Sequence, residues 1–274
     1  MDPELRAHSR PRLVALAASL LACGGQVGGS GQVDGGGPPA AQFSGYVTAV
    51  QLSDVSQEIL ASFSSSATPL VLPFLGSCTA DNEVVAGCCY APTTPLRGAS
   101  SALAGDIQVD PGGGMPALSL VGNLQSGYAL QSATLWTPGD VLRVTASGAA
   151  VQSFAGSLQT VAPLEGVAPP SLTAPATTTA IDRSQDFSIQ WTSGFVAGDQ
   201  VMLWFETTAS WIIACTVADA AGNLSVPSSL LQNVAAGDSA IMNLDRFSTT
   251  VVTANNATVI LEGISGISAS ATFL

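Results

Sequence analysis

The stretch Phe187-Ser188-Ile189-Gln190-Trp191-Thr192 decides the fold class, because apolar and polar residues alternate along it. This period of two is typical of a β-strand with one face in a core and the other in water. Residues 43–274 repeat the pattern in short runs, which turn residues such as Pro138-Gly139-Asp140 separate, and no long helical period occurs. The sequence therefore predicts an all-β protein.

The predicted organisation has four parts. Residues 1–22 are expected to be a signal peptide, and residues 23–42, rich in glycine, a flexible tether. Residues 43–165 are expected to form an N-terminal β-sandwich-like domain, and residues 166–274 an immunoglobulin-like β-sandwich with a Trp in an early strand. Cys215 is the only cysteine in that last part, so the inter-sheet disulfide common in such domains is expected to be absent.

Charge and composition exclude several kinds of chemistry. The only histidine, His8, lies in the predicted signal peptide, and the chain has no lysine. A chain that starts at Cys23 therefore cannot form a Ser/His/Asp triad, a Cys/His pair, a Schiff base or a P-loop. It keeps four arginines against seventeen acidic residues, a formal net charge of −13, which makes a nucleic-acid partner unfavourable.

The segment Leu20-Leu21-Ala22-Cys23 resembles a bacterial lipobox. It follows a basic stretch with three arginines and the apolar run 13–22, which is too short to span a bilayer. We expect Cys23 to carry a lipid and to anchor the protein to a membrane, most simply the outer membrane or the cell surface. An ordinary cleaved secretory signal and a buried Cys23 in a cytoplasmic fold are the alternatives.

Two further groups of segments resemble predicted lipoproteins of myxobacteria and their relatives. The first is Pro138-Gly139-Asp140-Val141-Leu142-Arg143-Val144-Thr145-Ala146-Ser147-Gly148 with Phe154-Ala155-Gly156-Ser157-Leu158. The second is Cys215-Thr216-Val217 with Ala221-Gly222 and Ser228-Ser229-Leu230-Leu231. The resemblance implies a β fold and an envelope location. It implies no catalytic residues.

The cysteines Cys78, Cys88 and Cys89 lie within twelve residues. If Asp81-Asn82 is a two-residue hairpin turn, Cys89 rather than Cys88 shares the face of Cys78, so a Cys78–Cys89 disulfide is expected. The connectivity among these three and Cys215 stays open. A zinc or redox site is the rival, but it lacks a fourth ligand and a CxxC motif.

The hairpin formed by residues 200–217 has two apolar faces. With residues 207–210 as its loop, Glu206 pairs with Trp211, and one face holds Val201, Leu203, Phe205, Ile212 and Ala214. Either the rest of the protein covers this second face, or it is a docking face for a protein or glycan partner. In the docking hypothesis, Phe205→Ser leaves an isolated second domain folded.

No residue of the mature chain stands out as catalytic, as a metal ligand or as a cofactor ligand. Asp219-Ala220-Ala221-Gly222-Asn223 is only faintly similar to a calcium loop and is expected to be a plain turn. The sequence therefore predicts a lipid-anchored, non-catalytic binding or structural module. The alternative is a secreted hydrolase with an Asp/Glu pair, for which Asp199, Glu206 and Asp238 are candidates.

Overall fold

The structure is a computed structural model that describes residues 43–274, apart from residues 53–55, 66–82, 93–99, 125–126, 133–134, 175–176 and 208–210. The predicted signal peptide, the tether, Cys23 and Cys78 lie outside the described residues. Within them the chain folds almost entirely into β-strands, which form three sheets. The all-β, sandwich-like fold class predicted from the alternation is thus confirmed.

One large sheet forms the frame of the molecule, with the strand order β3-β4-β15-β14-β17-β18-β1-β2-β5 and with β12 beside β18 and β8 beside β2. Its strands are β1 (Phe43–Leu52), β2 (Gln57–Ser65), β3 (Glu83–Val85), β4 (Cys88–Pro92), β5 (Ser100–Ala102), β8 (Tyr128–Ser132), β12 (Thr178–Ile181), β14 (Gln200–Thr207), β15 (Trp211–Ala218), β17 (Ser239–Ala254) and β18 (Ala257–Phe273). The hairpin of β17 and β18 is by far its longest unit. β1 pairs with β18 in parallel, from Phe43 opposite Ala257 onward.

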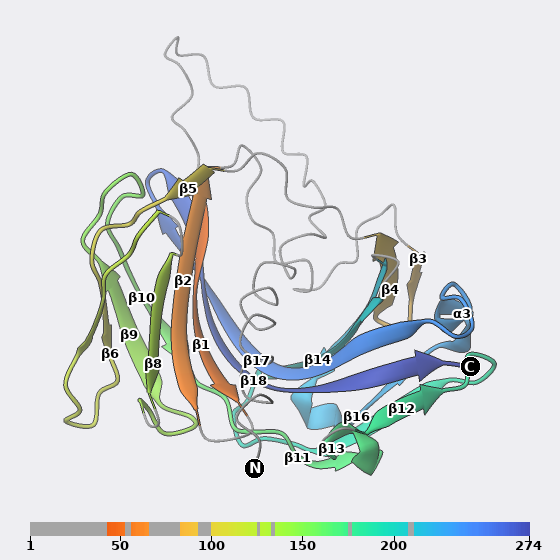
Figure 1. Ribbon diagram of the computed structural model, residues 1–274. Coiled ribbons are helices and arrows are strands. Elements are labelled where there is room, and N and C mark those ends of the chain that lie inside the picture. The colour runs from red at the N-terminus through yellow and green to blue at the C-terminus, as the bar shows by residue number, and fades with distance from the viewer. Residues whose placement is uncertain are drawn as a thin grey trace, which may run out of the picture.

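Two smaller sheets pack on the outer side of the curved large sheet (Figure 1). The first has the order β10-β9-β6-β7 and consists of β6 (Ile107–Asp110), β7 (Leu118–Leu120), β9 (Val141–Ala146) and β10 (Phe154–Gln159). The second has the order β11-β13-β16 and consists of β11 (Glu165–Ala168), β13 (Phe187–Thr192) and β16 (Asn223–Val226). Short helical turns are η1 (Pro170–Leu172), η2 (Asp219–Ala221) and α3 (Ser228–Leu231).

The large sheet buries one face, which we call the convex face, in two separate cores. Along β17, Ala240, Met242 and Leu244 belong to the core beneath the β11-β13-β16 sheet, whereas Val252 and Ala254 contact the core beneath the β10-β9-β6-β7 sheet. Because side chains alternate along a strand, these even-numbered residues share one face. The odd-numbered residues of β17 therefore point to the opposite, concave face.

Two glycines in β18 permit close approach where the hairpin passes between the cores. A Cβ at Gly263 would collide with the carbonyl oxygen of Gln159 in β10, and one at Gly266 would collide with the carboxylate of Asp245. A glycine inside a strand often marks such a contact. The missing side chains thus let β10 pack closely on one face of β18 and the Asp245 carboxylate pack closely on the other.

The expected division between residues 165 and 166 does not separate the two cores. The core of the first half takes Ala257, Val259 and Leu261 from β18, and the core of the second half takes Cys88 from β4. Each core therefore includes residues from a strand of the other half of the chain, because strands far apart in the sequence pair in the large sheet. The two sandwiches therefore share one continuous sheet.

A disulfide joins Cys88 to Cys215, with an S–S distance of 2.04 Å and a sequence separation of 127. Because β4 and β15 are neighbours in one sheet, this bond lies within a sheet, and it does not contradict the expected absence of an inter-sheet disulfide at Cys215. The bond itself was not predicted, because no local pattern shows that β4 pairs with β15 and places Cys88 opposite Cys215. Cys89 is disulfide-bonded as well. Its predicted partner, Cys78, lies outside the described residues, so the Cys78–Cys89 pair stays a prediction.

The expected docking face is part of the core. Glu206 pairs with Ile212, not with Trp211, and this one-residue shift brings Ile213 and Cys215 onto the face of Phe205. The side chains of Val201, Leu203 and Phe205 are completely buried, and the Phe205 ring contacts those of Phe187 and Phe273. Ile212 is described only through its backbone pairing. The second sandwich itself covers this face.

We therefore expect Phe205→Ala to destabilise the folded chain by about 3–5 kcal/mol, because it removes a fully buried ring and leaves a cavity. Urea unfolding of the mature chain measures the effect. Phe195→Ala is the matched control: this ring is 71% exposed, and its loss should change the unfolding free energy by about 0.5 kcal/mol or less. Equal effects of the two substitutions would contradict the core assignment.

Candidate functional site

The concave face of the large sheet carries an apolar cluster of its own. Its buried members are Cys89, Met202, Trp204, Ala214 and Phe247, and Ile264 packs against them. We call these six residues the concave cluster. They come from β4, β14, β15, β17 and β18, which are all strands of the one sheet. Among the described residues, no second layer contributes to this cluster.

Two buried carboxyl groups flank the concave cluster. Asp245 in β17 accepts a hydrogen bond of 2.8 Å from the Trp204 indole nitrogen. Burial raises the pKa of Asp245 to about 7, and the Trp204 hydrogen bond acts in the opposite direction. Burial likewise raises the pKa of Glu262 in β18 to about 8, assisted by the charge of Asp245 and opposed by a hydrogen bond with Thr48. Both groups are therefore largely protonated in mildly acidic solution.

Tyr46 in β1 extends this polar strip across the sheet. Burial raises the pKa of its hydroxyl, a hydrogen bond with Ser62 lowers it, and the nearby charge of Glu262 raises it further. The strip thus combines two carboxyl groups that titrate near neutral pH with a tyrosine hydroxyl that keeps its proton there. Within the described ranges, no three His, Cys, Asp or Glu residues lie close enough together to hold a metal ion.

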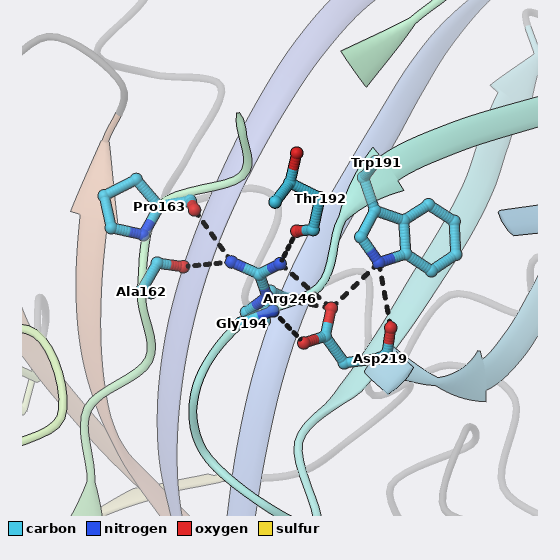
Figure 2. A network of polar contacts seen from close by, with 7 residues as sticks. All are labelled: Ala162, Pro163, Trp191, Thr192, Gly194, Asp219 and Arg246. Carbon is cyan, nitrogen blue, oxygen red and sulfur yellow. Dashed lines mark hydrogen bonds and ion pairs between the residues drawn. The ribbon is translucent and has the colours of Figure 1, made fainter. Parts of the chain in front are cut away.

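A second polar group lies on the convex side, between the two cores (Figure 2). Arg246, 1% exposed, uses all five of its N–H groups. It donates to the Asp219 carboxylate from Nε at 3.0 Å and from Nη2 at 2.9 Å, and to the Thr192 carbonyl at 2.7 Å. Its other terminal nitrogen donates to the carbonyls of Ala162 at 3.0 Å and Pro163 at 2.7 Å.

Asp219 is held from three sides, since the Trp191 indole at 2.8 Å and the backbone N–H of Gly194 also donate to its carboxylate. The calcium-loop likeness of this segment is therefore replaced by a structural role. Asp219 opens η2, and Gly222 ends it with φ +65°, as expected for a plain turn. The carboxylate that would bind a cation is already neutralised by Arg246.

Asp199 lies beside this ion pair. It is 3% exposed, and neither of its carboxylate oxygens has a hydrogen-bond partner. Burial and the charge of Asp219 raise its pKa to about 6, and Arg246 counteracts them. The three predicted hydrolytic candidates are not brought together: Asp199 precedes β14, and Glu206 lies near the other end of that strand, about 23 Å away at the rise of a β-strand. Asp238 precedes β17 at the Glu206 end, because Glu206 pairs with Ile241.

The sequence analysis did not identify Asp245, Glu262 or Arg246, which are all buried ionisable groups. A signal existed for Arg246, because it continues the apolar series Ala240, Met242 and Leu244 at a spacing of two. A charged residue in such a series must be buried with partners.

We expect Arg246→Met to destabilise the protein by about 3–5 kcal/mol, because it leaves the buried carboxylate of Asp219 and three carbonyls without their donors. Arg143→Met, at an exposed position in β9, is the matched control and should have little effect. Adding Asp219→Asn to Arg246→Met should recover part of the loss. Urea unfolding of all four variants checks this, and equal effects of the two arginine substitutions would refute it.

Stability should fall as pH rises from 5 to 8. The folded-state pKa values of Asp199, Asp245 and Glu262 lie above their ordinary values, so these groups stabilise the fold below pH 4 and lose that contribution as pH passes 6 to 8. Glu262→Gln should reduce the difference in unfolding free energy between pH 5 and pH 8 by about 2–4 kcal/mol. Glu165→Gln, at an exposed position, is the control. A wild-type chain that is more stable at pH 8 than at pH 5 would contradict this assignment.

No helix in the described part of the chain is long and apolar enough to cross a membrane. No protein family matches the chain, and no curated protein does. Two solved structures show weak similarity. One comes from work on the host cell surface retention of a 1.5-MDa bacterial ice-binding adhesin, with 14% identity over 85% of this chain and 66% of that chain, and a TM-score of 0.20. The other is a tetra-tandem repeat in the extending region of a large adhesion protein, with 12% identity over 78% of this chain and 56% of that chain, and a TM-score of 0.19. Similarity at this level carries no argument about the present chain.

Proposed function

We propose that this protein is a lipid-anchored, non-catalytic binding or structural module of the bacterial cell envelope. The observation that carries the proposal is the Cys88–Cys215 disulfide. Such bonds persist in oxidising compartments and are rare in the cytosol. The disulfide supports export, and the lipobox at Cys23 supplies both the export signal and the anchor.

The disulfide and the hydrogen bonds of Arg246 support a molecule whose two sandwiches do not move relative to each other. The disulfide connects β4 to β15 across 127 residues, and Arg246 joins the two cores with five hydrogen bonds. A rigid, acidic body on a glycine-rich tether suits the presentation of a fixed surface away from the lipid headgroups. Its negative charge disfavours direct docking on anionic lipids, so the lipid would provide the attachment. A protein or glycan is the class of partner we expect.

The hydrolase alternative rests on the raised pKa values of Asp245 and Glu262. Asp245 lies opposite Gly266, four residues beyond Glu262 on the neighbouring strand. Strand geometry puts their α-carbons about 14 Å apart. Glycosidases hold their two carboxyl groups roughly 5–9.5 Å apart on either side of the scissile bond, so the deciding feature is whether the two groups face each other across a substrate and not the separation of their α-carbons. Both carboxyls here project from one face of a single sheet, which favours the binding module over the hydrolase.

Cys23→Ala should abolish lipid attachment and release the protein from the membrane fraction of a bacterial host. Ser30→Ala, in the tether, is the matched control and should leave attachment intact. Detergent partitioning and intact-mass measurement of the mature N-terminus provide the readout, and non-reducing peptide mapping tests the Cys88–Cys215 bond in the same preparation. Lipid-free mature protein that begins at another residue would refute the anchor. Free thiols at Cys88 and Cys215 would refute the oxidising location.

A further inference from the structure

Asp199 lies opposite Asp219 on the convex face of the large sheet. Gln200 pairs with Ala218, and the backbone N–H of Asp219 donates to the Asp199 carbonyl at 3.0 Å. Directly opposed residues of an antiparallel pair have Cβ atoms about 5 Å apart, so the two carboxyl groups are close neighbours. Two like charges in such positions destabilise a sheet.

This cluster holds one positive charge for two carboxyl groups. The Asp219 carboxylate accepts two hydrogen bonds from Arg246, one from the Trp191 indole and one from the Gly194 N–H (Figure 2). Asp199 is 3% exposed, yet neither of its carboxylate oxygens accepts a hydrogen bond from any described residue. An ionised carboxyl group that is buried without a partner is costly. The geometry therefore favours the protonated form of Asp199.

Few charged groups act on Asp199. Burial and the charge of Asp219 in η2 raise its pKa to about 6, and Arg246 in β17 counteracts them. The loop 193–198 and the last residues of β15 add no titratable side chain. In the folded arrangement Asp199 thus keeps its proton in mildly acidic solution and loses it near neutral pH.

The loop 193–198 is attached to this cluster at both ends. It connects β13 of a smaller sheet to β14 of the large sheet. Near its start, the N–H of Gly194 donates to the Asp219 carboxylate. At its end, Gly198 has φ +96° and directly precedes Asp199. Any change in the charge of Asp199 therefore acts on a loop whose other end depends on the neighbouring carboxylate.

The same loop contacts the first half of the chain. Its residue Phe195 is 71% exposed, and the ring lies so close to Gly139 that a Cβ there would collide with it. Gly139 belongs to the turn before β9, in the first sandwich. The loop thus carries an exposed aromatic ring, a kind of side chain that often anchors a partner, across the junction of the two sandwiches.

We propose that Asp199 is a pH-dependent switch for the loop 193–198: the loop is closed when Asp199 is protonated and opens when Asp199 ionises. Ionised Asp199 repels Asp219, and opening of the loop lets water reach both carboxylates while the N–H of Gly194 leaves Asp219. Arg246 keeps its carbonyl partners, so the two sandwiches stay joined while Phe195 moves away from Gly139. This inference does not depend on the proposed envelope function.

The expected size of the effect follows from proton linkage. The pKa of Asp199 is about 6 in the closed loop, and its ordinary value is 3.8, which we expect for the open loop. A group whose pKa is raised in one form favours that form at low pH. The ratio of closed to open loop should therefore fall by up to about a hundredfold between pH 3 and pH 7.

Hydrogen exchange of the mature chain at pH 4.5 and pH 7, corrected for the intrinsic effect of pH on exchange, tests the switch. Protection in peptides that contain Gly194 should be about 10- to 30-fold lower at pH 7. Asp199→Asn, which stays neutral, should keep its protection at both pH values. Asp106→Asn, at an exposed position, is the matched control and should behave as the wild type. Peptides from β13 report whether the fold itself is intact.

Two outcomes of this experiment would overturn the switch. Equal wild-type protection at both pH values would show that the loop does not respond, and a wild-type response in Asp199→Asn would assign the response to another group. Calcium chloride distinguishes the remaining alternative. If it restores protection at pH 7, a metal ion rather than a proton controls the loop, and the proposal is wrong.

A second measurement needs no variant. In wild-type protein the NMR signals of the Asp199 carboxyl carbon and the Gly194 amide should titrate together, with a midpoint above 3.8. An Asp199 signal that titrates at its ordinary value, or a Gly194 amide that does not follow it, would contradict the coupling.

Discussion

The buried guanidinium of Arg246 is the constraint on which the arrangement of the two sandwiches depends. It lies at the point where β17 leaves one core and enters the other, and its partners come from the strand connection at residues 162–163, the end of β13 and the start of η2. A charge in this position is tolerable only when every donor is used. The curved arrangement of the two sandwiches and the hydrogen bonds of Arg246 therefore depend on each other. Moving the two sandwiches apart would leave a buried charge and several carbonyls without partners.

Odd- and even-numbered residues of the β17–β18 hairpin pack on opposite faces of the large sheet. Even-numbered residues of β17 build the two convex cores, and its odd-numbered residues carry Asp245 and Phe247 to the concave side. Glu262 and Ile264 do the same in β18. Because a pleated strand can serve two faces, one hairpin supports three separate packing environments. Asp245 and Glu262 lie in the concave environment, whose apolar cluster contains no residue from the two smaller sheets.

Local patterns were enough to predict the fold class, but not the pairing of distant strands. The alternation in residues 187–192 correctly predicted β13, with Ile189 and Trp191 buried. The hairpin of β14 and β15 was found, yet its register was wrong by one residue, because the turn residues at 207–210 do not specify a loop length. The docking-face hypothesis had another origin: both faces of this hairpin are apolar, and no local pattern shows that the second sandwich covers the face of Val201, Leu203 and Phe205. The pairing of β4 with β15, and with it the disulfide of Cys215, leaves no local mark in the sequence.

The candidate site was less predictable than the fold. An isolated aspartate or glutamate in an alternating strand indicates a solvated face, and Asp245 and Glu262 follow that pattern. Their burial is a tertiary effect that no local pattern shows; the carboxylate of Asp245, for example, packs so closely on Gly266 that a Cβ there would collide with it. Arg246 could have been recognised from its place in an apolar series, whereas its partner Asp219 could not, since it lies 27 residues earlier on another element.

The parallel pairing of β1 with β18 has a consequence for how the protein is made. The first strand of the fold finds its neighbour more than two hundred residues later, and the core around Val47 and Ile59 also needs Val259 and Leu261. A ribosome-bound or half-translocated chain therefore holds β1 and β2 without the strand that completes their sheet. Such topology delays folding, because the entropy of closing a very long loop must be overcome first. In the proposed export of this protein the delay would be useful, since the chain would stay unfolded until nearly all of it had crossed the membrane.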